Sequence, residues 1–98
     1  MSKLVREEQW VWVVVQAPGG NEQFLGHYNE EDNISFIPAF LVKQEAEEAL
    51  PLLPKVTGAR YEVQAIQIED LSQRAAASGF RIYALNGKGE VLEKIDPS

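Results

Sequence analysis

The stretch ISFIPAFLVKQEAEEALPLLPKVTGARYEVQAIQI, residues 34–68, organises the chain. Residues 34–41 are rich in aromatic and β-branched side chains, which is typical of a strand. Residues 43–53 have the composition of a helix with a stripe of Ala and Leu, and residues 61–68 are again strand-like. Because the connection between the two strands is short, we predict parallel pairing in one sheet with a right-handed crossover.

Two prolines constrain where the helix of this unit ends and where its first strand lies in the sheet. Pro51 lacks the amide that would bond back to the preceding turn, so the helix should end or kink near Leu50. Pro38 cannot donate to a ladder, so strand 34–41 should be an edge, or should place Pro38 against the end of a shorter neighbour. The helix is predicted to bury the residues at helical spacing, which are Ala46, Ala49, Leu50 and Leu53.

The segment QWVWVVVQ, residues 9–16, has the strongest strand pattern in the chain. Apolar residues alternate onto both faces of this strand: Trp10, Trp12 and Val14 on one, and Val11, Val13 and Val15 on the other. Strands that are apolar on both faces are covered on both sides. We therefore predict that this strand is central.

The other segments complete the order β-β-β-α-β-α-β-β. A turn at 17–21 should join strand 9–16 to a strand at 22–29 as an antiparallel hairpin. The chain should continue after residue 68 with a helix at 69–78, in which Leu71, Ala75 and Ala76 face inward, a left-handed Gly79, and strands 80–85 and 90–95 joined by an Asn86-Gly87 turn.

The predicted fold is α+β, a two-layer sandwich with two helices on one face of a sheet. The sheet should be mixed, mostly antiparallel, and made of five or six strands. We expect one domain over residues 1–98, with residues 1–8 disordered.

Composition excludes several function classes. The chain has no cysteine, which removes disulfides, thiolate zinc sites, iron–sulfur ligation and a cysteine nucleophile. The net charge is −6, and the nine Lys and Arg residues are scattered singly, so no basic stripe is available for phosphates. We therefore expect no nucleic-acid partner and no anionic membrane partner.

Apolar runs and the start of the sequence favour a cytoplasmic location. The longest apolar run, Trp10–Val15, is far shorter than the ~20 residues that span a bilayer. The first eight residues have no apolar core after their basic residues, unlike a signal peptide.

His27 is the only histidine, and it precedes an acidic loop, Glu30–Asn33. This loop could orient His27 or share a metal with it, although a lone histidine in a half-exposed hairpin is more often an ordinary surface residue. The loop lacks the spaced ligands and the glycine of an EF-hand, and a structural zinc site needs four Cys or His ligands. We predict no metal, and a solvated acidic turn.

Glycines and serines give no catalytic pattern. The clusters Gly19-Gly20 and Gly87-Lys88-Gly89 lie between predicted strands, whereas a phosphate-binding loop joins a strand to a helix. No serine has a flanking elbow motif or a matching His–Asp pattern. We predict no cofactor and no catalytic residue set.

Aromatic residues offer the one positive functional indication. Two helices on one face would leave the other face of the sheet open, and Trp10, Trp12 and Tyr28 uncovered there would form an apolar patch that marks a partner site. The alternative is that strand twist and long hairpins cover these rings.

From Ile34 onward, the chain resembles SseB-like small bacterial domains. The resemblance lies in Ile37-Pro38-Ala39-Phe40 followed by Glu45-Ala46-Glu47-Glu48-Ala49, and then in Asp70-Leu71 and Gly79-Phe80. Val42 departs from it, because that pattern tends to have a Ser helix cap at this position. The resemblance implies an accessory or interaction domain without shared catalytic residues, so no site residue carries over.

Two functional hypotheses follow. The first is a non-enzymatic, cytoplasmic interaction or accessory domain that binds a protein, or a second copy of itself, through Trp10, Trp12 and Tyr28. The second is a small-molecule-binding or enzymatic domain with a cleft near His27 and the Glu30–Asn33 loop.

Overall fold

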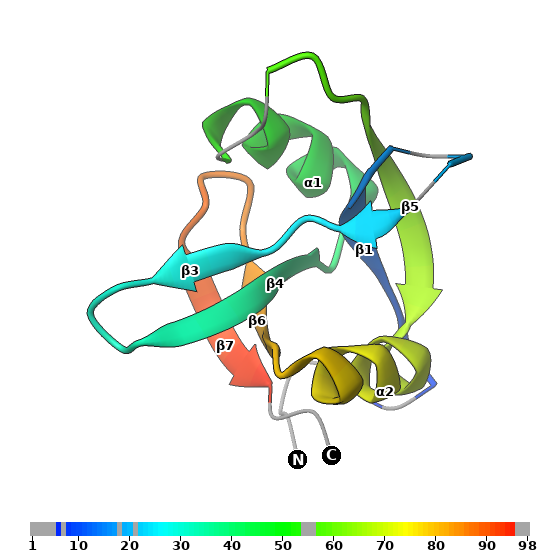
Figure 1. Cartoon of the computed structure of the whole chain (residues 1–98). Helices are drawn as coiled ribbons and strands as arrows, with labels where there is room; N and C mark the ends of the chain where they lie inside the picture. Colours follow the sequence, from blue (N-terminus) through cyan, green and yellow to red (C-terminus); the bar gives the residue numbers. More distant parts are fainter. Residues whose placement is uncertain (1–5, 7, 18, 21, 54–56, 96–98) are drawn as a thin grey trace.

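The computed structural model describes residues 6, 8–17, 19–20, 22–53 and 57–95. It is an α+β fold with a mixed seven-stranded sheet (Figure 1), which confirms the predicted class. Its elements are β1 (Trp10–Gln16), β2 (Gln23–Phe24), β3 (His27–Asn29), β4 (Ile34–Phe40), α1 (Lys43–Ala49), the 3₁₀ helix η1 (Leu50–Leu52), β5 (Tyr61–Gln67), α2 (Ile68–Ser78), β6 (Arg81–Leu85) and β7 (Val91–Ile95).

Strand β1 is central, as its apolar pattern predicts. It pairs antiparallel with β5 along its whole length, from Trp10↔Gln67 to Gln16↔Tyr61. On its other side it pairs with β2 near its carboxyl end, and with β4 at Trp12↔Phe40 alone. Val11, Val13 and Val15 are buried on the face that α2 covers, and Val14 is buried on the other face.

The strand predicted at 22–29 is divided in two, because β1 and β4 diverge beyond their single pair. The segment between them changes partner: β2 pairs with β1, and β3 pairs with β4. At the crossing, the Leu25 amide donates a hydrogen bond to the Val14 carbonyl over 2.8 Å, and the Leu25 side chain is buried. This division raises the strand count to seven, above the five or six predicted.

The predicted parallel pairing of strands 34–41 and 61–68 is wrong. Strand β5 pairs antiparallel with β1, and the parallel partner of β4 is β6. Because β4 and β5 are each antiparallel to β1, they run in the same direction with β1 between them. The short crossover therefore spans one intervening strand, which the local pattern does not reveal.

The helices lie on opposite faces of the sheet, so the predicted two-layer arrangement with both helices on one face is also wrong. Leu71 and Ala75 of α2 pack with Val11, Ile37 and Ile82. The core on the α1 face consists of Ala46, Ala49, Phe36, Phe40, Tyr83 and Leu85. Figure 1 shows α1 above the sheet and α2 below it.

Topology explains these positions. The connection through α1 runs from β4 past β1 to β5, and the connection through α2 returns from β5 to β6. Two crossovers of the same hand that run in opposite directions across a sheet lie on opposite faces. The wrong partner predicted for β5 therefore also gives the wrong face of the sheet for α2.

Local signals for the ends of the helices are confirmed. Helix α1 ends at Ala49, immediately before the 3₁₀ turn that contains Pro51. Gly79 follows α2 with φ 75° in the left-handed region. Of the residues predicted to face inward from α2, Leu71 and Ala75 are buried, whereas Ala76 is exposed.

Pro38 occupies the second of the two positions predicted for it. Strand β4 is not an edge, because β6 flanks it on one side while β3 and β1 flank it on the other. Pairing with β3 extends to Phe36 and pairing with β1 occurs at Phe40, so Pro38 lies at the gap between these neighbours.

Two further expectations concern the ends of the chain and membranes. The predicted disorder of residues 1–8 falls largely outside the described residues, since only Arg6 and Glu8 of that segment are described. Within the described ranges, no helix has the length and apolar character needed to cross a membrane.

Replacing Val42 should stabilise the protein. Val42 is the N-cap of α1, has extended backbone angles (φ −129°, ψ 134°), and makes no side-chain cap hydrogen bond. Val42→Ser supplies a cap oxygen and forms a capping box with Glu45, so the free energy of unfolding should rise by about 1 kcal/mol. Urea denaturation measures this change. Val42→Ala is the control, and an equal gain from both variants would contradict the capping explanation.

Gly26 should tolerate no side chain. A Cβ at Gly26 would overlap the half-buried Phe80 ring, whereas the closest atom to a Cβ at Gly87 would be the end of the flexible Glu48 side chain, at 2.5 Å. We expect Gly26→Ala to lower the free energy of unfolding by about 1–3 kcal/mol, and Gly87→Ala by less than about 1 kcal/mol. Equal losses in urea denaturation would show that Phe80 moves aside.

Candidate functional site

Trp10 and Trp12 lie on the α1 face of β1. Alternation puts both rings on the side where Trp12 packs against the core next to α1. Trp10 is 58% exposed, whereas Trp12 is half-buried, with Lys43 Nζ 5.5 Å from its ring centroid. The exposed indole of Trp10 therefore continues a partly covered apolar surface.

Tyr28 does not join this surface. Its neighbour His27 packs edge-on against Phe36 of the α1 face, with the ring centroids 5.3 Å apart. Tyr28 is paired with Ser35 and so points to the opposite face, where it is 50% exposed. Its hydroxyl donates a hydrogen bond to the Asn33 side chain. Of the three residues predicted for a partner surface, the fold thus brings only the two tryptophans together.

The outer edge of β5 borders the tryptophan surface. Two hydrogen bonds fix which way the β5 main chain points: the Ile68 amide donates to the Gln9 carbonyl, and the Ala17 amide donates to the Arg60 carbonyl. Ile68 and Arg60 are both even-numbered, so the main-chain groups of the even-numbered residues in this segment point toward β1. Because antiparallel strands alternate, the amides and carbonyls of Val63, Ala65 and Gln67 point away from β1.

Strand β5 lacks the features that usually protect a sheet edge. It has seven residues in unbroken register, without proline or lysine, and Glu62 is its only charge. The opposite edge, β7, is shorter, carries Lys94 and has a register shift opposite Ala84 and Leu85. No described strand other than β1 pairs with β5, so β5 offers an open template for another strand.

Side chains along this edge are uncharged on the α1 face. Ala65 is exposed and lies beside Trp12 in the sheet, and Gln67 lies beside Trp10. Val63 packs against the core on the same face. A strand added to β5 would therefore meet a main-chain template with two indoles one strand further in.

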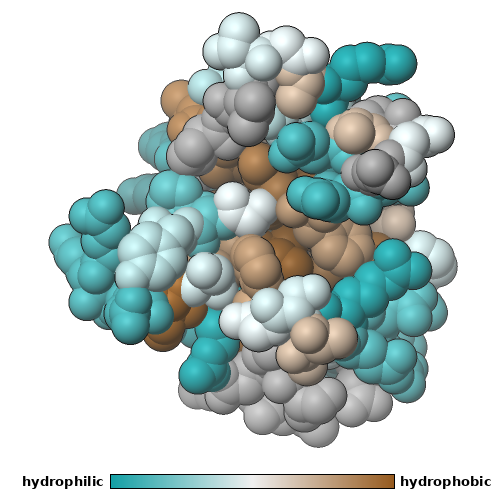
Figure 2. Space-filling model, viewed as in Figure 1, coloured by the Kyte–Doolittle hydropathy of each residue, from teal (hydrophilic) through white to brown (hydrophobic). Residues whose placement is uncertain are grey.

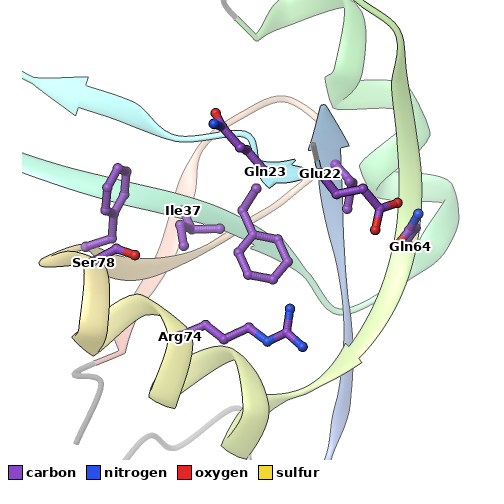
Figure 3. A pocket seen from close by; sticks show the side chains of 9 residues that line it. Glu22, Gln23, Ile37, Gln64, Arg74 and Ser78 are labelled. Carbon is purple, nitrogen blue, oxygen red and sulfur yellow. The ribbon is translucent and has the colours of Figure 1, made fainter. Parts of the chain in front are cut away.

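A hollow on the α2 face is the second candidate site, and Figure 2 shows hydrophobic surface at the centre of this side of the molecule. The hollow has a volume of about 440 Å³ and a mixed lining. Its apolar lining residues are Val15, Phe24, Ile37 and Phe80, and its polar lining residues are Glu22, Gln23, Gln64, Arg74 and Ser78. In Figure 3, Arg74 extends from α2 across the hollow toward the side where Gln64 and Glu22 lie.

Electrostatic features of this hollow are modest. The Arg74 guanidinium lies 5.8 Å from the centroid of the Phe24 ring, so Arg74 makes a cation–π contact with Phe24. Glu22 accepts a hydrogen bond from the Gly19 amide at 3.0 Å. The hollow can hold an apolar group, and its lining includes one cation, Arg74, and one anion, Glu22.

His27 lines a further hollow of about 500 Å³, together with Tyr28, Tyr61 and Phe80. The acidic loop beside it is exposed and bonded internally: the Asn29 amide nitrogen donates to Asp32, and the Glu31 main-chain amide donates to Asn29. Lys94 lies 3.7 Å from Asp32. Among the described residues, no group of three or more His, Asp or Glu side chains is placed to hold a metal ion.

Comparison of the chain with known families, with curated proteins and with solved structures found no match. The sequence holds one signal for the β5 edge, since residues 61–67 have strand character with a single charge and no proline. That signal becomes meaningful only once the topology places β5 at an edge.

The two tryptophans should differ in their access to solvent. Trp10→Phe leaves only half-buried Trp12, whose fluorescence should be quenched weakly by acrylamide, whereas Trp12→Phe leaves exposed Trp10, which should be quenched strongly. Stern–Volmer constants of the two variants measure this difference. Equal constants would contradict the placement of the two rings.

Proposed function

We propose that this chain is a non-enzymatic interaction domain that binds an extended protein segment as an added strand along β5. The observation that carries the proposal is the open edge at Val63, Ala65 and Gln67, which lacks the usual protections. Strand addition obtains affinity from main-chain hydrogen bonds and specificity from alternate side chains. No reactive group is required.

Energetics support an edge site of this kind. Each hydrogen bond formed with the outward groups contributes about 0.5–1.5 kcal/mol net. Trp10 lies next to Gln67 in the sheet and is exposed, so an added strand could cover part of its indole. Tryptophan is among the residues that dominate binding energy at interfaces.

Other features of the sequence fit this proposal. The net charge of −6 disfavours a nucleic acid as the partner. A cytoplasmic location and an accessory role, as in the SseB-like domains that the chain resembles, belong to the proposal. Tyr28 lies on the far face and is left out of the binding surface.

A second candidate function is the binding of a small molecule on the α2 face. It is favoured by the hollow beside Arg74, whose volume of about 440 Å³ falls within the range of ligand pockets. The neighbouring hollow, which His27 lines, belongs to the same candidate function. A ligand there would combine an apolar body with a polar group that faces Arg74.

A display library of random seven-residue peptides tests strand addition. Selected peptides should protect the amides of Val63, Ala65 and Gln67 from hydrogen exchange, because those amides point outward. Ala65→Pro removes one outward donor while leaving the ladder to β1 intact, so it should weaken peptide binding by about tenfold or more.

Val91→Lys is the matched control, because Val91 is exposed on β7 at the other edge of the sheet. This variant should bind the selected peptides like the unmodified chain. Selected peptides that instead change the signals of Arg74 or His27, or that bind the Ala65→Pro variant as tightly as the unmodified chain, would contradict strand addition and favour the second candidate.

A further inference from the structure

We infer that the strand added to β5 is β5 of a second copy of this chain, antiparallel to the first about a two-fold axis at Ala65. This inference rests on the proposed function, since it names the occupant of the same edge. Three observations support it: the symmetry of the outward groups, the apolar row beside them, and the charges at the two ends of the strand.

The outward main-chain groups are symmetric about Ala65. Val63 and Gln67 lie two residues to either side of it, so a two-fold axis there pairs Ala65 with Ala65, and Val63 with Gln67, of the second copy. All of these residues have outward amides and carbonyls. The pairing uses the groups that β1 leaves unpaired and requires no shift of β5.

The side chains on the α1 face also match across this axis. Residues opposite each other in paired strands lie on the same face, so the row from Trp12 to Ala65 would continue through Ala65 and Trp12 of the second copy. The small, exposed Ala65 side chains allow close approach at the axis. The joined sheet would therefore carry an apolar row between two indoles.

Charges at the ends of β5 favour the antiparallel arrangement. Arg60 precedes the strand, and Glu69 and Asp70 follow it at the start of α2. All three side chains are exposed. Antiparallel pairing brings Arg60 of each copy toward Glu69 and Asp70 of the other, whereas parallel pairing would bring like charges together.

Glu62, the only charge within β5, does not oppose this pairing. With the axis at Ala65, Glu62 lies opposite Ile68 of the second copy and away from its Glu62. A two-fold axis at Glu62 itself would bring the two carboxylates together. The charge pattern thus selects an axis near the middle of the strand.

A charge-exchange experiment tests the inference. Arg60→Glu in one chain, and Glu69→Lys with Asp70→Lys in another, should each weaken self-association by about tenfold, because each homodimer then has like charges at both ends. An equimolar mixture should regain the affinity of the unmodified chain, since a mixed dimer has unlike charges at both ends. Sedimentation velocity measures association, and urea denaturation confirms that each variant is folded.

Ala65→Pro should leave the chain monomeric, and Val91→Lys should leave the dimer unchanged. An unmodified chain that stays monomeric up to ~1 mM would overturn the inference, as would a dimer that survives Ala65→Pro or a mixture no tighter than its parts. If the chain is monomeric and selected peptides protect the β5 amides from exchange, self-association through β5 is wrong and strand addition by another protein still stands. Failure of both measurements would overturn both proposals.

Discussion

The antiparallel ladder between β1 and β5 is the contact on which the remaining structure depends. Strand β1 carries apolar side chains on both faces, so the sheet needs cover on each side. Placing β5 on one side of β1 and β4 on the other forces the chain to cross the sheet in both directions. The returning crossover puts α2 opposite α1 and leaves β5 at the rim, where β1 is the one described strand that pairs with it. Fold and candidate site thus share one origin.

Local signals predicted the elements well, because they act within a few residues. Three of these signals are correct: the run Trp10–Val15 predicts a strand, Pro51 predicts the end of a helix, and Gly79 predicts a helix cap. Strand partners could not be predicted in the same way. Nothing in residues 34–68 shows that β1, far away in sequence, inserts between β4 and β5. The error about the faces of the helices followed from this one missing long-range pairing.

The candidate sites were less predictable than the fold. The sequence predicts that Tyr28 joins the tryptophans, yet Tyr28 lies on the other face, because the face of a side chain depends on strand register and a slip of one residue reverses it. The hollow on the α2 face combines Phe24, Ile37 and Arg74, which come from three separated elements. Their proximity is a product of topology. His27 lines a hollow as the second hypothesis expects, but Glu31 and Asp32 of the exposed acidic loop hydrogen-bond with Asn29.

Residue-resolved hydrogen exchange of the dilute protein tests the central claim most directly. If β5 pairs with β1 alone, the amides of Glu62, Gln64 and Ile66 should exchange slowly, because they donate to β1. The amides of Val63, Ala65 and Gln67 should exchange rapidly, which gives an alternating pattern along the strand. Uniform protection, or protection of the odd-numbered amides alone, would contradict both the placement of β5 at the rim and its register with β1.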